Sequence, residues 1–375
     1  MDRQLSELLA ALATAANDGG PAVEVLLDES NPNGWRIEYL APQDLPGFEQ
    51  PMAVVRTSGS TGRAKRTVLS VSALASSAQA TAEFLGFEGQ WLLALPVHYV
   101  AGLSVLTRSL FAGTKPVVMD TEGSFSATAF TEAANQMIDS RRITSLVPTQ
   151  LARLLDNPAP ETLQALKRFD AILLGGARAS KDLLVSARHH GLKIFQTYGS
   201  SETSGGLVYN GTALPGVQLA AHEGRIWVAG PMLADGYANS PEATAEHFIE
   251  RDGVRWYVTD DLGTVEKQRL KIIGRIDDVI NTGGIKLSAS KIEGLLEEFF
   301  TQAIVVPVPD PQWGHSVGLA YAGPTNTADA FEAVRRTLGK EAVPKHVRHY
   351  PLGLPQLPNG KFNRQLVIEE LGVRD

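Results

Sequence analysis

Residues 171–195 read AILLGGARASKDLLVSARHHGLKIF, with two short apolar runs on either side of a longer mixed segment. The runs Ala171–Leu174 and Ile194–Phe195 predict buried strands, and the spacing of apolar residues in Ser180–His189 predicts a helix between them. Continuous apolar strands that alternate with helices belong to parallel sheets that are covered on both faces. The segment therefore predicts an α/β fold with a mostly parallel sheet.

The same alternation extends over residues 50 to about 200. Helical spacing recurs in Ser72–Leu85 and Ala127–Ile138, and further strands are predicted at Ala53–Val55, Trp91–Leu95, Pro116–Met119 and Ile143–Val147. From about residue 205 to 275, glycines become frequent and short strands are predicted at Arg225–Ala229, Arg255–Val258 and Leu270–Ile273. We therefore expect a large N-terminal domain, residues 1–274, with mainly parallel sheets plus small antiparallel β-structure.

The last hundred or so residues predict a second, smaller domain of α+β type. After a boundary at Gly274–Asp278 the pattern gives helices at Ser290–Phe300 and Ala328–Leu338, and strands at Ala303–Val308 and Val317–Ala322. A segment of this size with its own apolar residues can form an independent core. We assign this C-terminal domain to residues 275–375.

The amino-acid composition excludes several kinds of partner and site. The 34 basic and 41 acidic residues give a net charge of −7, which argues against nucleic acid or an anionic membrane as a partner. The absence of cysteine excludes disulfides, thiolate metal sites and a thioester on the protein itself. The spacing of Leu5, Leu8, Leu9 and Leu12 predicts an amphipathic helix at the N-terminus. Asp2 and Glu7 are acidic where a secretory leader would be basic, so we expect a cytoplasmic protein.

The first motif is TSGSTGRAK at residues 57–65, directly after the strand Ala53–Val55. Its glycines let backbone N–H groups turn inward, its hydroxyls can donate, and Lys65 adds a positive charge, which together suit phosphate oxygens. It is neither a Walker A loop nor a dinucleotide-binding loop. The alternative is a solvent-exposed Ser/Gly turn.

The second motif is QTYGSSET at residues 196–203, after the strand that ends at Phe195. Ligands of open α/β sheets bind at such carboxyl ends of strands. Tyr198 offers a flat face to a base, Ser201 a hydroxyl, and Glu202 a hard oxygen ligand for Mg²⁺. The alternative is a helix N-terminus with Ser201 as its cap and Glu202 in its first turn.

Two later segments carry further charged residues. In WYVTDDLG, residues 256–263, a carboxylate could accept ribose hydroxyls, and in GRIDDVINTGGIK, residues 274–286, Arg275 could donate to the same sugar or to phosphate. The alternatives are a β-turn at Asp260–Asp261 and an interdomain ion pair for Arg275. LPNGKFNR, residues 357–364, contains Lys361, which by itself is more simply a lysine in solvent.

Together these segments resemble the adenylate-forming superfamily, the acyl-CoA synthetases and their relatives, over roughly residues 50–365. The resemblance implies that a carboxylic acid reacts with ATP and Mg²⁺ to an acyl-adenylate, which coenzyme A then attacks as a substrate. It implies an N-terminal domain that binds ATP and acid, and a mobile C-terminal domain that carries the catalytic lysine. The sequence leaves the oligomeric state open, and a homo-oligomer is compatible with it.

The resemblance also implies residue roles. Lys361 is the catalytic lysine, Glu202 the metal ligand and Asp277 the hinge. The ATP-binding residues are Thr57, Ser58, Gly59, Ser60, Thr61, Gly62, Lys65, Gly176, Ala177, Tyr198, Gly199, Ser201, Asp261 and Arg275. The coenzyme A tunnel is lined by Gly283, Gly284 and Lys286. The acid substrate is contacted by His98, Tyr99, Arg108 and Gly175. Asp260 replaces the usual glycine before Asp261, so either carboxylate could hold the ribose.

Within the superfamily, the segment Leu95–Gly113 is most similar to ligases that act on o-succinylbenzoate in menaquinone biosynthesis. The chain is short for the superfamily, and we expect the missing length to be N-terminal because the phosphate loop begins at Thr57. Those ligases have histidine at the position of Tyr99, one place after His98. Arg108 would pair with a second carboxylate of the acid, because a cation buried without a partner is costly. The alternative is an arginine that reaches the surface.

These residues are compatible with four functions. An aryl-succinate–CoA ligase is favoured over another small or aryl acid–CoA ligase and over a stand-alone adenylation enzyme that charges a carrier protein. From a different class comes a non-catalytic nucleotide-binding relic of the same fold. The presence of both Glu202 and Lys361 argues against the relic.

Overall fold

The structure is a computed structural model that describes residues 3–28, 30–31, 34–57, 64–119, 125–276, 278–357 and 362–372. The chain forms two compact units. The first contains Met1–Ala220, Trp227–Val258 and Glu266–Leu270, and the second contains Ala221–Ile226, Thr259–Val265 and Lys271–Asp375.

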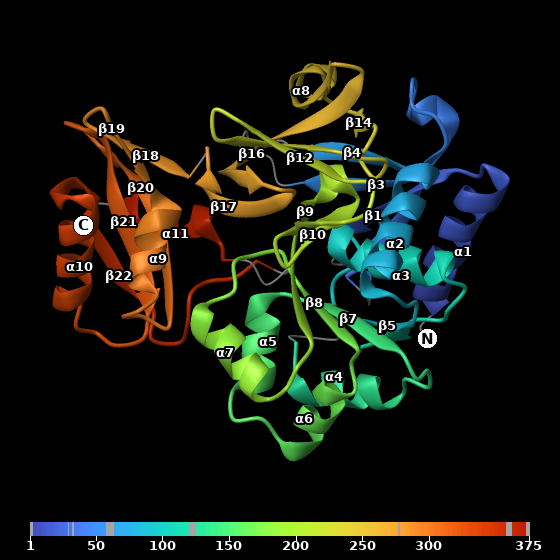
Figure 1. Cartoon of the computed structure of the whole chain (residues 1–375), viewed down its shortest axis with the longest axis horizontal. Helices are drawn as coiled ribbons and strands as arrows, with labels where there is room; N and C mark the ends of the chain where they lie inside the picture. The colour runs from blue at the N-terminus through green and yellow to red at the C-terminus, as the bar shows by residue number, and fades with distance from the viewer. Residues whose placement is uncertain are drawn as a thin grey trace. The chain divides into compact units, whose positions relative to one another are not determined.

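A parallel sheet forms the centre of the first unit (Figure 1). It runs in the order β9-β8-β7-β5-β6, and the strands are β5 (Gln90–Leu93), β6 (Val117–Val118), β7 (Arg142–Leu146), β8 (Ala171–Leu174) and β9 (Ile194–Ser200). Every neighbouring pair in this order is parallel. The predicted parallel α/β core is thus confirmed.

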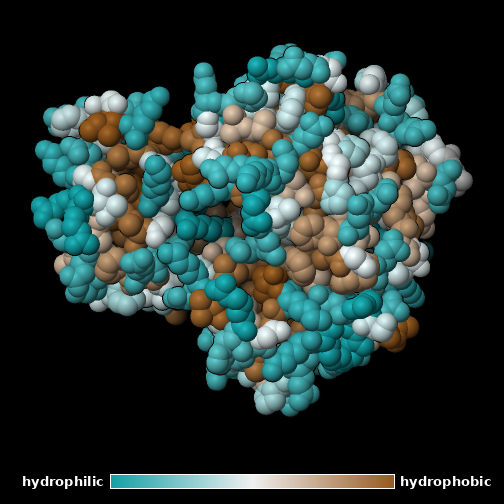
Figure 2. Space-filling view, in the orientation of Figure 1, coloured by the Kyte–Doolittle hydropathy of each residue, from teal (hydrophilic) through white to brown (hydrophobic). Residues whose placement is uncertain are grey.

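Helices cover this sheet on both sides. In Figure 1 the strands β5, β7 and β8 lie between α2 (Val71–Leu85) and α3 (Val100–Phe111) on one side, and α4 (Ala127–Asn135), α5 (Pro148–Leu155), α6 (Pro160–Lys167) and α7 (Lys181–His189) on the other. Phe130, Leu151 and Leu166 of these outer helices are fully buried against the strands. Figure 2 shows mainly hydrophilic residues over α4 and α6, as expected when the apolar stripe of each helix faces the core.

Local sequence sets where two of these helices begin. The hydroxyl of Ser180 accepts a hydrogen bond from the backbone N–H of Leu183, and the hydroxyl of Ser126 accepts one from Ala129. Serine at these positions satisfies an N–H that has no partner within the helix. The helix predicted at Ser180–His189 therefore begins at Lys181, one residue after its cap.

A second sheet of the first unit holds the ends of the predicted phosphate loop. It runs β14-β4-β3-β1-β2, and α1 (Arg3–Asp18) precedes it in the chain. Its strands are β1 (Ala22–Leu27), β2 (Trp35–Leu40), β3 (Pro51–Thr57), β4 (Lys65–Ser70) and β14 (Gly236–Tyr237). The antiparallel strand β4 follows the loop directly. The simple strand–helix alternation expected after residue 50 is therefore wrong here, because the buried Val68 and Leu69 extend a second strand before α2 begins.

The glycine-rich region contains the small β-structure that was predicted. Its elements are η2 (Ser201–Thr203), β10 (Gly205–Tyr209), β11 (Thr212–Ala213), β12 (Gln218–His222), β13 (Arg225–Ala229), α8 (Pro241–His247), β15 (Phe248–Arg251), β16 (Val254–Glu266) and β17 (Arg269–Arg275). The pairs β9–β10, β10–β11 and β15–β16 are antiparallel. Strands β12, β13, β16 and β17 each contain residues of both units.

The second unit has the predicted α+β character. Its sheet runs β19-β18-β21-β20, and β22 pairs with β21 in parallel. Its elements are β18 (Val279–Thr282), β19 (Ile285–Ser288), α9 (Ala289–Leu296), β20 (Gln302–Asp310), β21 (Gly314–Ala322), α10 (Ala328–Leu338), β22 (His346–His349) and α11 (Arg364–Gly372). Ile292, Leu319 and Val334 form the centre of its core. In the described part of the chain, no helix has both the length and the apolar character needed to cross a bilayer.

Candidate active site

Part of the predicted site lies outside the described residues. This applies to Ser58, Gly59, Ser60, Thr61 and Gly62 of the phosphate loop, to the hinge residue Asp277 and to Lys361. Thr57 and Lys65, at the two ends of the loop, lie directly opposite each other in the β3–β4 pair. The antiparallel pairing therefore brings both ends of the predicted loop together.

A buried carboxylate reinforces the strands below these ends. Glu24 of β1 has no exposed side-chain surface and accepts hydrogen bonds from Arg56 Nε at 2.7 Å and Arg66 Nη2 at 2.6 Å. Arg56 is the residue before Thr57, and Arg66 follows Lys65. Since a buried charge is stable only when it is paired, this arrangement holds β1, β3 and β4 in register at the loop. The role of Glu24 was not predicted, although a glutamate inside the apolar run AVEVLL is a visible signal of a buried charge.

Asn239 holds the backbone on either side of Lys65. Its Nδ2 donates to the carbonyl of Ala64 at 2.9 Å, and its Oδ1 accepts from the backbone N–H of Arg66 at 2.8 Å. Both contacts span more than 170 residues of sequence. Nothing in the local sequence around Asn239 points to this contact.

Lys65, Glu202 and Tyr237 form one cluster in the first unit. Glu202 is 7% exposed, and its Oε1 accepts a hydrogen bond of 2.9 Å from the hydroxyl of Tyr237. The Nζ of Lys65 lies over the Tyr237 ring, 4.7 Å from its centroid. Lys65 and Glu202 come from the first and second predicted motifs, whereas Tyr237 was not predicted. The structure thus brings a cation and a carboxylate from distant motifs to one aromatic side chain.

The segment around Glu202 is a single 3₁₀ turn, Ser201–Thr203, followed directly by β10. The residue at the N-cap position is Ser200, and its backbone N–H donates to Thr203 Oγ1 at 2.9 Å. The alternative of a helix N-terminus capped by Ser201 is therefore wrong. Ser201 and Glu202 are both buried.

Two of the predicted glycines lie close to other atoms, Gly175 to a side chain and Gly199 to a backbone. A Cβ atom on Gly175, which follows β8, would lie 2.3 Å from Thr197 Oγ1, and one on Gly199 would lie 2.0 Å from the carbonyl oxygen of Gly205. At Gly199 the obstacle is backbone, so only glycine fits there. Gly176, Ala177 and Tyr198 lie on the same carboxyl ends of β8 and β9, which is where open α/β sheets bind ligands.

His98 and Tyr99 precede α3, and their ring centroids are 4.1 Å apart. Burial lowers the pKa of His98 to about 4 and raises the pKa of Tyr99. His98 is therefore neutral at pH 7, and its buried Nε2 has no hydrogen-bond partner. It can offer an aromatic surface or a single hydrogen bond, but no positive charge, to a substrate.

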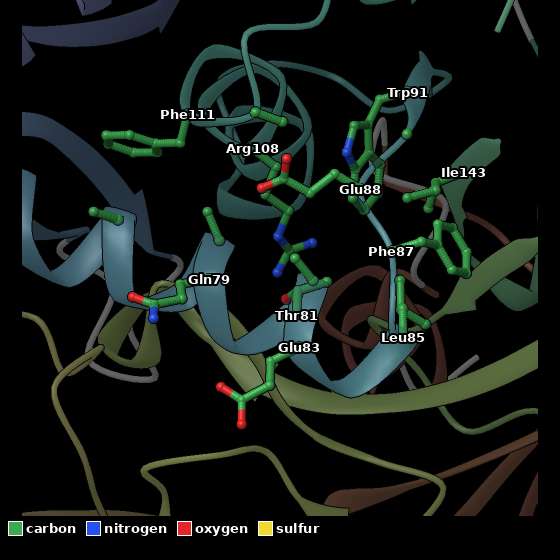
Figure 3. Close-up of a pocket in the computed structure, with 15 residues that line it drawn as sticks. Gln79, Thr81, Glu83, Leu85, Phe87, Glu88, Trp91, Arg108, Phe111 and Ile143 are labelled. Carbon is green, nitrogen blue, oxygen red and sulfur yellow. The ribbon is translucent and has the colours of Figure 1, made fainter.

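Arg108 lies on α3 and is only 6% exposed. Its Nε and Nη2 are buried and have no hydrogen-bond partner, and its guanidinium carbon lies 5.4 Å from the centroid of the Trp91 ring. Figure 3 shows the guanidinium directed from α3 towards α2, near Thr81, at a cavity of about 380 Å³. The alternative of an arginine that reaches the surface is therefore wrong. Arg108 is a buried cation with unused donors.

In the second unit, the predicted ribose-binding residues form an ion-pair cluster. Arg275 Nη1 lies 3.2 Å from Asp261 Oδ1, and Arg225 Nη2 lies 3.0 Å from Asp260 Oδ1. Both aspartates belong to strand β16, so the alternative of a β-turn is wrong. The alternative of an ion pair for Arg275 is present in the structure, since Arg275 pairs with both aspartates across the predicted boundary after residue 274. All three residues belong to the second compact unit.

Gly283 and Gly284 form the two-residue turn between β18 and β19, with φ angles of +57° and +86°. Positive φ at both central residues is typical of the hairpin turn that suits twisted strands. Lys286 is exposed on β19. These residues therefore have a structural reason for their identity, and their role towards coenzyme A stays a prediction.

The described residues suit Mg²⁺ that arrives with a nucleotide. Among them, no group of three or more His, Asp or Glu side chains could enclose a metal ion. Mg²⁺ at phosphoryl-transfer sites takes one or two carboxylates and completes its shell with phosphates and water. The buried carboxylate of Glu202 fits this requirement.

Comparisons with known proteins agree with the motifs. A family model described as AMP-binding enzyme matches residues 5–238. The probable 2-succinylbenzoate–CoA ligase of Mycobacterium tuberculosis (strain CDC 1551 / Oshkosh) is 38% identical over 328 residues, which cover 84% of this chain and 83% of that protein.

Solved structures show the same fold. The o-succinylbenzoate CoA synthetase MenE from Bacillus subtilis, in complex with the acyl-adenylate intermediate OSB-AMP, has a TM-score of 0.70 and 26% identity, covering 84% of this chain and 68% of that one. ATP-bound MatB from Rhodopseudomonas palustris has a TM-score of 0.74 and 25% identity, covering 87% and 69%. With its ordered motifs and a matching model over most of the first unit, the chain belongs to the AMP-binding enzyme family.

Proposed function

We propose that this protein is an ATP-dependent acid–CoA ligase whose acid is 2-succinylbenzoate, in menaquinone biosynthesis. In the first step the acid and ATP give acyl-adenylate and pyrophosphate. In the second step the thiol of coenzyme A attacks the acyl-adenylate, which gives acyl-CoA and releases AMP. The choice of acid is supported by the similarity to a probable 2-succinylbenzoate–CoA ligase and by Arg108, a buried guanidinium whose Nε and Nη2 have no hydrogen-bond partner. The cavity beside Arg108 is also lined by Glu83 and Glu88, and His98, Tyr99 and Gly175 do not line it. A second carboxylate on the substrate would supply the missing partner, and a fatty acid would leave the charge unpaired.

The first half-reaction joins two anions, so the protein has to supply positive charge and alignment. Lys65 and the backbone and hydroxyls of residues 57–62 would bind the β- and γ-phosphates. Mg²⁺ held by Glu202 would supply further charge neutralisation on the triphosphate when bound. Tyr198 and Gly176–Ala177 would contact the adenine, which is compatible with their place at the strand ends.

Asp261 is assigned to the ribose hydroxyls. Asp260 contacts Arg225 at 3.0 Å and Arg275 at 3.9 Å, so its carboxylate already has two cationic partners. Asp261 lies 3.2 Å from Arg275, which could turn to phosphate once the ribose is bound. The assignment of Asp261 rests on its place in the motif, where it matches the ribose-binding aspartate of the family.

Lys361 is assigned as the catalytic lysine from its motif. Its ammonium would bridge the attacking carboxylate and the α-phosphate, and so stabilise the charge that develops between them. The acyl-adenylate would then be attacked by the thiol of coenzyme A, because the chain has no cysteine to serve instead. Rotation of the C-terminal domain about Asp277 would withdraw Lys361 and present Gly283, Gly284 and Lys286 to the pantetheine.

The proposed small-molecule partners are the acid, ATP and coenzyme A, and the proposed compartment is the cytoplasm, where ATP and coenzyme A are available. The second candidate is a ligase for another small or aryl acid, or an adenylation enzyme for a separate carrier protein. The buried, neutral His98 favours neither. A non-catalytic relic is disfavoured because the Lys65, Glu202 and Tyr237 cluster is assembled.

A pyrophosphate-release assay with a panel of acids tests the proposal. We expect turnover with 2-succinylbenzoate, ATP, Mg²⁺ and coenzyme A, and far weaker turnover with benzoate, succinate and a long-chain fatty acid. Product analysis by mass spectrometry separates acyl-adenylate from acyl-CoA. Equal rates with benzoate and 2-succinylbenzoate would refute the role of a second carboxylate, and the absence of turnover with every acid would favour the relic.

A further inference from the structure

In the cluster of Lys65, Glu202 and Tyr237, Tyr237 is the residue that lies outside the predicted motifs. Its hydroxyl donates to the Glu202 carboxylate. We propose that Tyr237 is a positioning residue: it orients the Glu202 carboxylate towards the cation of MgATP and keeps Lys65 beside it. The inference rests on the proposed use of ATP, and it adds a residue outside all the predicted motifs.

Tyr237 is itself rigidly held. It is 2% exposed and belongs to β14, where it pairs with Thr67 of β4, two residues after Lys65. Its backbone N–H donates to Thr244 Oγ1 at 2.8 Å, and its ring packs edge-on against Phe248 with centroids 5.7 Å apart. The phenol therefore has a fixed direction relative to the strand that begins with Lys65.

This rigid phenol acts on Glu202 through one oxygen only. The hydroxyl donates to Oε1 at 2.9 Å, which fixes the plane of the carboxylate. Partners that orient a metal ligand in this way contribute strongly to metal affinity. The second carboxylate oxygen can then face a cation, while the ring face carries the Lys65 ammonium at 4.7 Å. One side chain thereby sets the spacing between the proposed metal ligand and the lysine of the phosphate loop.

Tyr237→Phe isolates the hydroxyl, because the ring under Lys65 is retained. The matched control is Tyr209→Phe, since Tyr209 is also fully buried and its hydroxyl also has a partner, Thr81 Oγ1 at 3.1 Å. ATP binding is measured by calorimetry over a series of Mg²⁺ concentrations and in EDTA. Circular dichroism and thermal unfolding establish that both variants are folded.

For Tyr237→Phe we expect the Mg²⁺ concentration that gives half-maximal ATP affinity to rise about 10- to 100-fold, with ATP affinity in EDTA unchanged. For Tyr209→Phe neither value should change more than twofold. The same Mg²⁺ dependence in Tyr237→Phe as in the control would overturn the inference. So would an equal loss of ATP affinity in EDTA, which would indicate a purely structural role.

Glu202→Gln provides a second route if Tyr237→Phe does not fold. The amide oxygen can still accept from the phenol, so the fold is retained while the charge is lost. We expect its ATP affinity to become nearly independent of Mg²⁺, and Tyr237→Phe in this background to add less than a twofold change. An unaltered Mg²⁺ dependence would overturn the inference. A wild-type protein that binds no ATP would instead refute the proposed function.

Discussion

Replacing Arg108 with methionine is expected to stabilise the protein and to abolish recognition of its acid. Both effects follow from the same observation. The side chain is 6% exposed, its Nε and Nη2 have no hydrogen-bond partner, and its guanidinium carbon lies 5.4 Å from the centroid of the Trp91 ring. Burying an unpaired ion lowers the stability of the folded state by several kcal/mol, and a cation–π contact offsets about 1–2 kcal/mol of this loss.

The magnitudes can be worked out separately for the two effects. Methionine fills the same space, contacts Trp91 through sulfur and carries no charge, so the free energy of unfolding should rise by about 1–2 kcal/mol. Losing one partner of a buried charge pair costs about 2–5 kcal/mol in binding. The KM for 2-succinylbenzoate should therefore rise about 30- to several-thousand-fold, with the KM for ATP unchanged within about twofold.

Arg142→Met is the matched control. The Nε and Nη2 of Arg142 donate to the carbonyls of Asp139 and Met137 at 2.9 Å and 2.8 Å. Its removal leaves those carbonyls without partners, so the control should lose about 1–3 kcal/mol of stability and keep its KM values. Thermal unfolding and steady-state pyrophosphate release measure both variants. If Arg108→Met loses stability like the control and keeps its KM for the acid, the reasoning is refuted.

Three further perturbations test other parts of the account. Lys361→Ala should lower acyl-adenylate formation by about 10²- to 10³-fold, yet spare thioester formation from supplied acyl-adenylate; equal loss of both would contradict domain alternation. Burial lowers the pKa of His98 from 6.5 to about 4. The neutral folded form therefore adds to the free energy of unfolding above pH 6.5, and this contribution is lost as the pH falls towards 4. After allowing for the partial exposure of the ring, the loss should be about 1–3 kcal/mol. His98→Phe should flatten urea-unfolding free energies across this range, and an unchanged slope would remove His98 as the cause. Gly199→Ala places a Cβ 2.0 Å from the Gly205 oxygen, so the free energy of unfolding should fall by at least about 2 kcal/mol. The control Gly372→Ala has open space around the new Cβ and should leave stability unchanged. Equal Tm values for the two variants would contradict the close approach.

Much of the fold could be predicted because it is encoded locally. The strand at Ala171–Leu174 and the helix at Ala328–Leu338 have the bounds expected from their apolar spacing. Apolar runs and helical periods report which faces are buried, whatever the partner is. Strand β4 was not predicted, because it begins with the polar residues Lys65 and Arg66 and only two of the four buried residues that follow are apolar.

In the candidate site, too, the residue types could be predicted from the sequence and the long-range contacts could not. The residue types needed for phosphate, ribose and Mg²⁺ are legible in the motifs, because each chemistry demands particular side chains next to strand ends or glycines. The contacts that arrange them are not. Asn239 meets Ala64 across 175 residues, and Tyr237 meets Glu202 across 35.

By itself, the amino-acid sequence determined the α/β class, the α+β second unit and the order of the motifs, since these depend on the periodicity and chemistry of neighbouring residues. Only the tertiary structure decided that Arg108 is buried with unused donors, that Glu24 secures the loop strands and that a tyrosine outside every motif holds Glu202. Burial and pairing of polar side chains depend on which distant elements pack together. Hydropathy along a chain cannot distinguish an arginine in solvent from one enclosed beside a tryptophan.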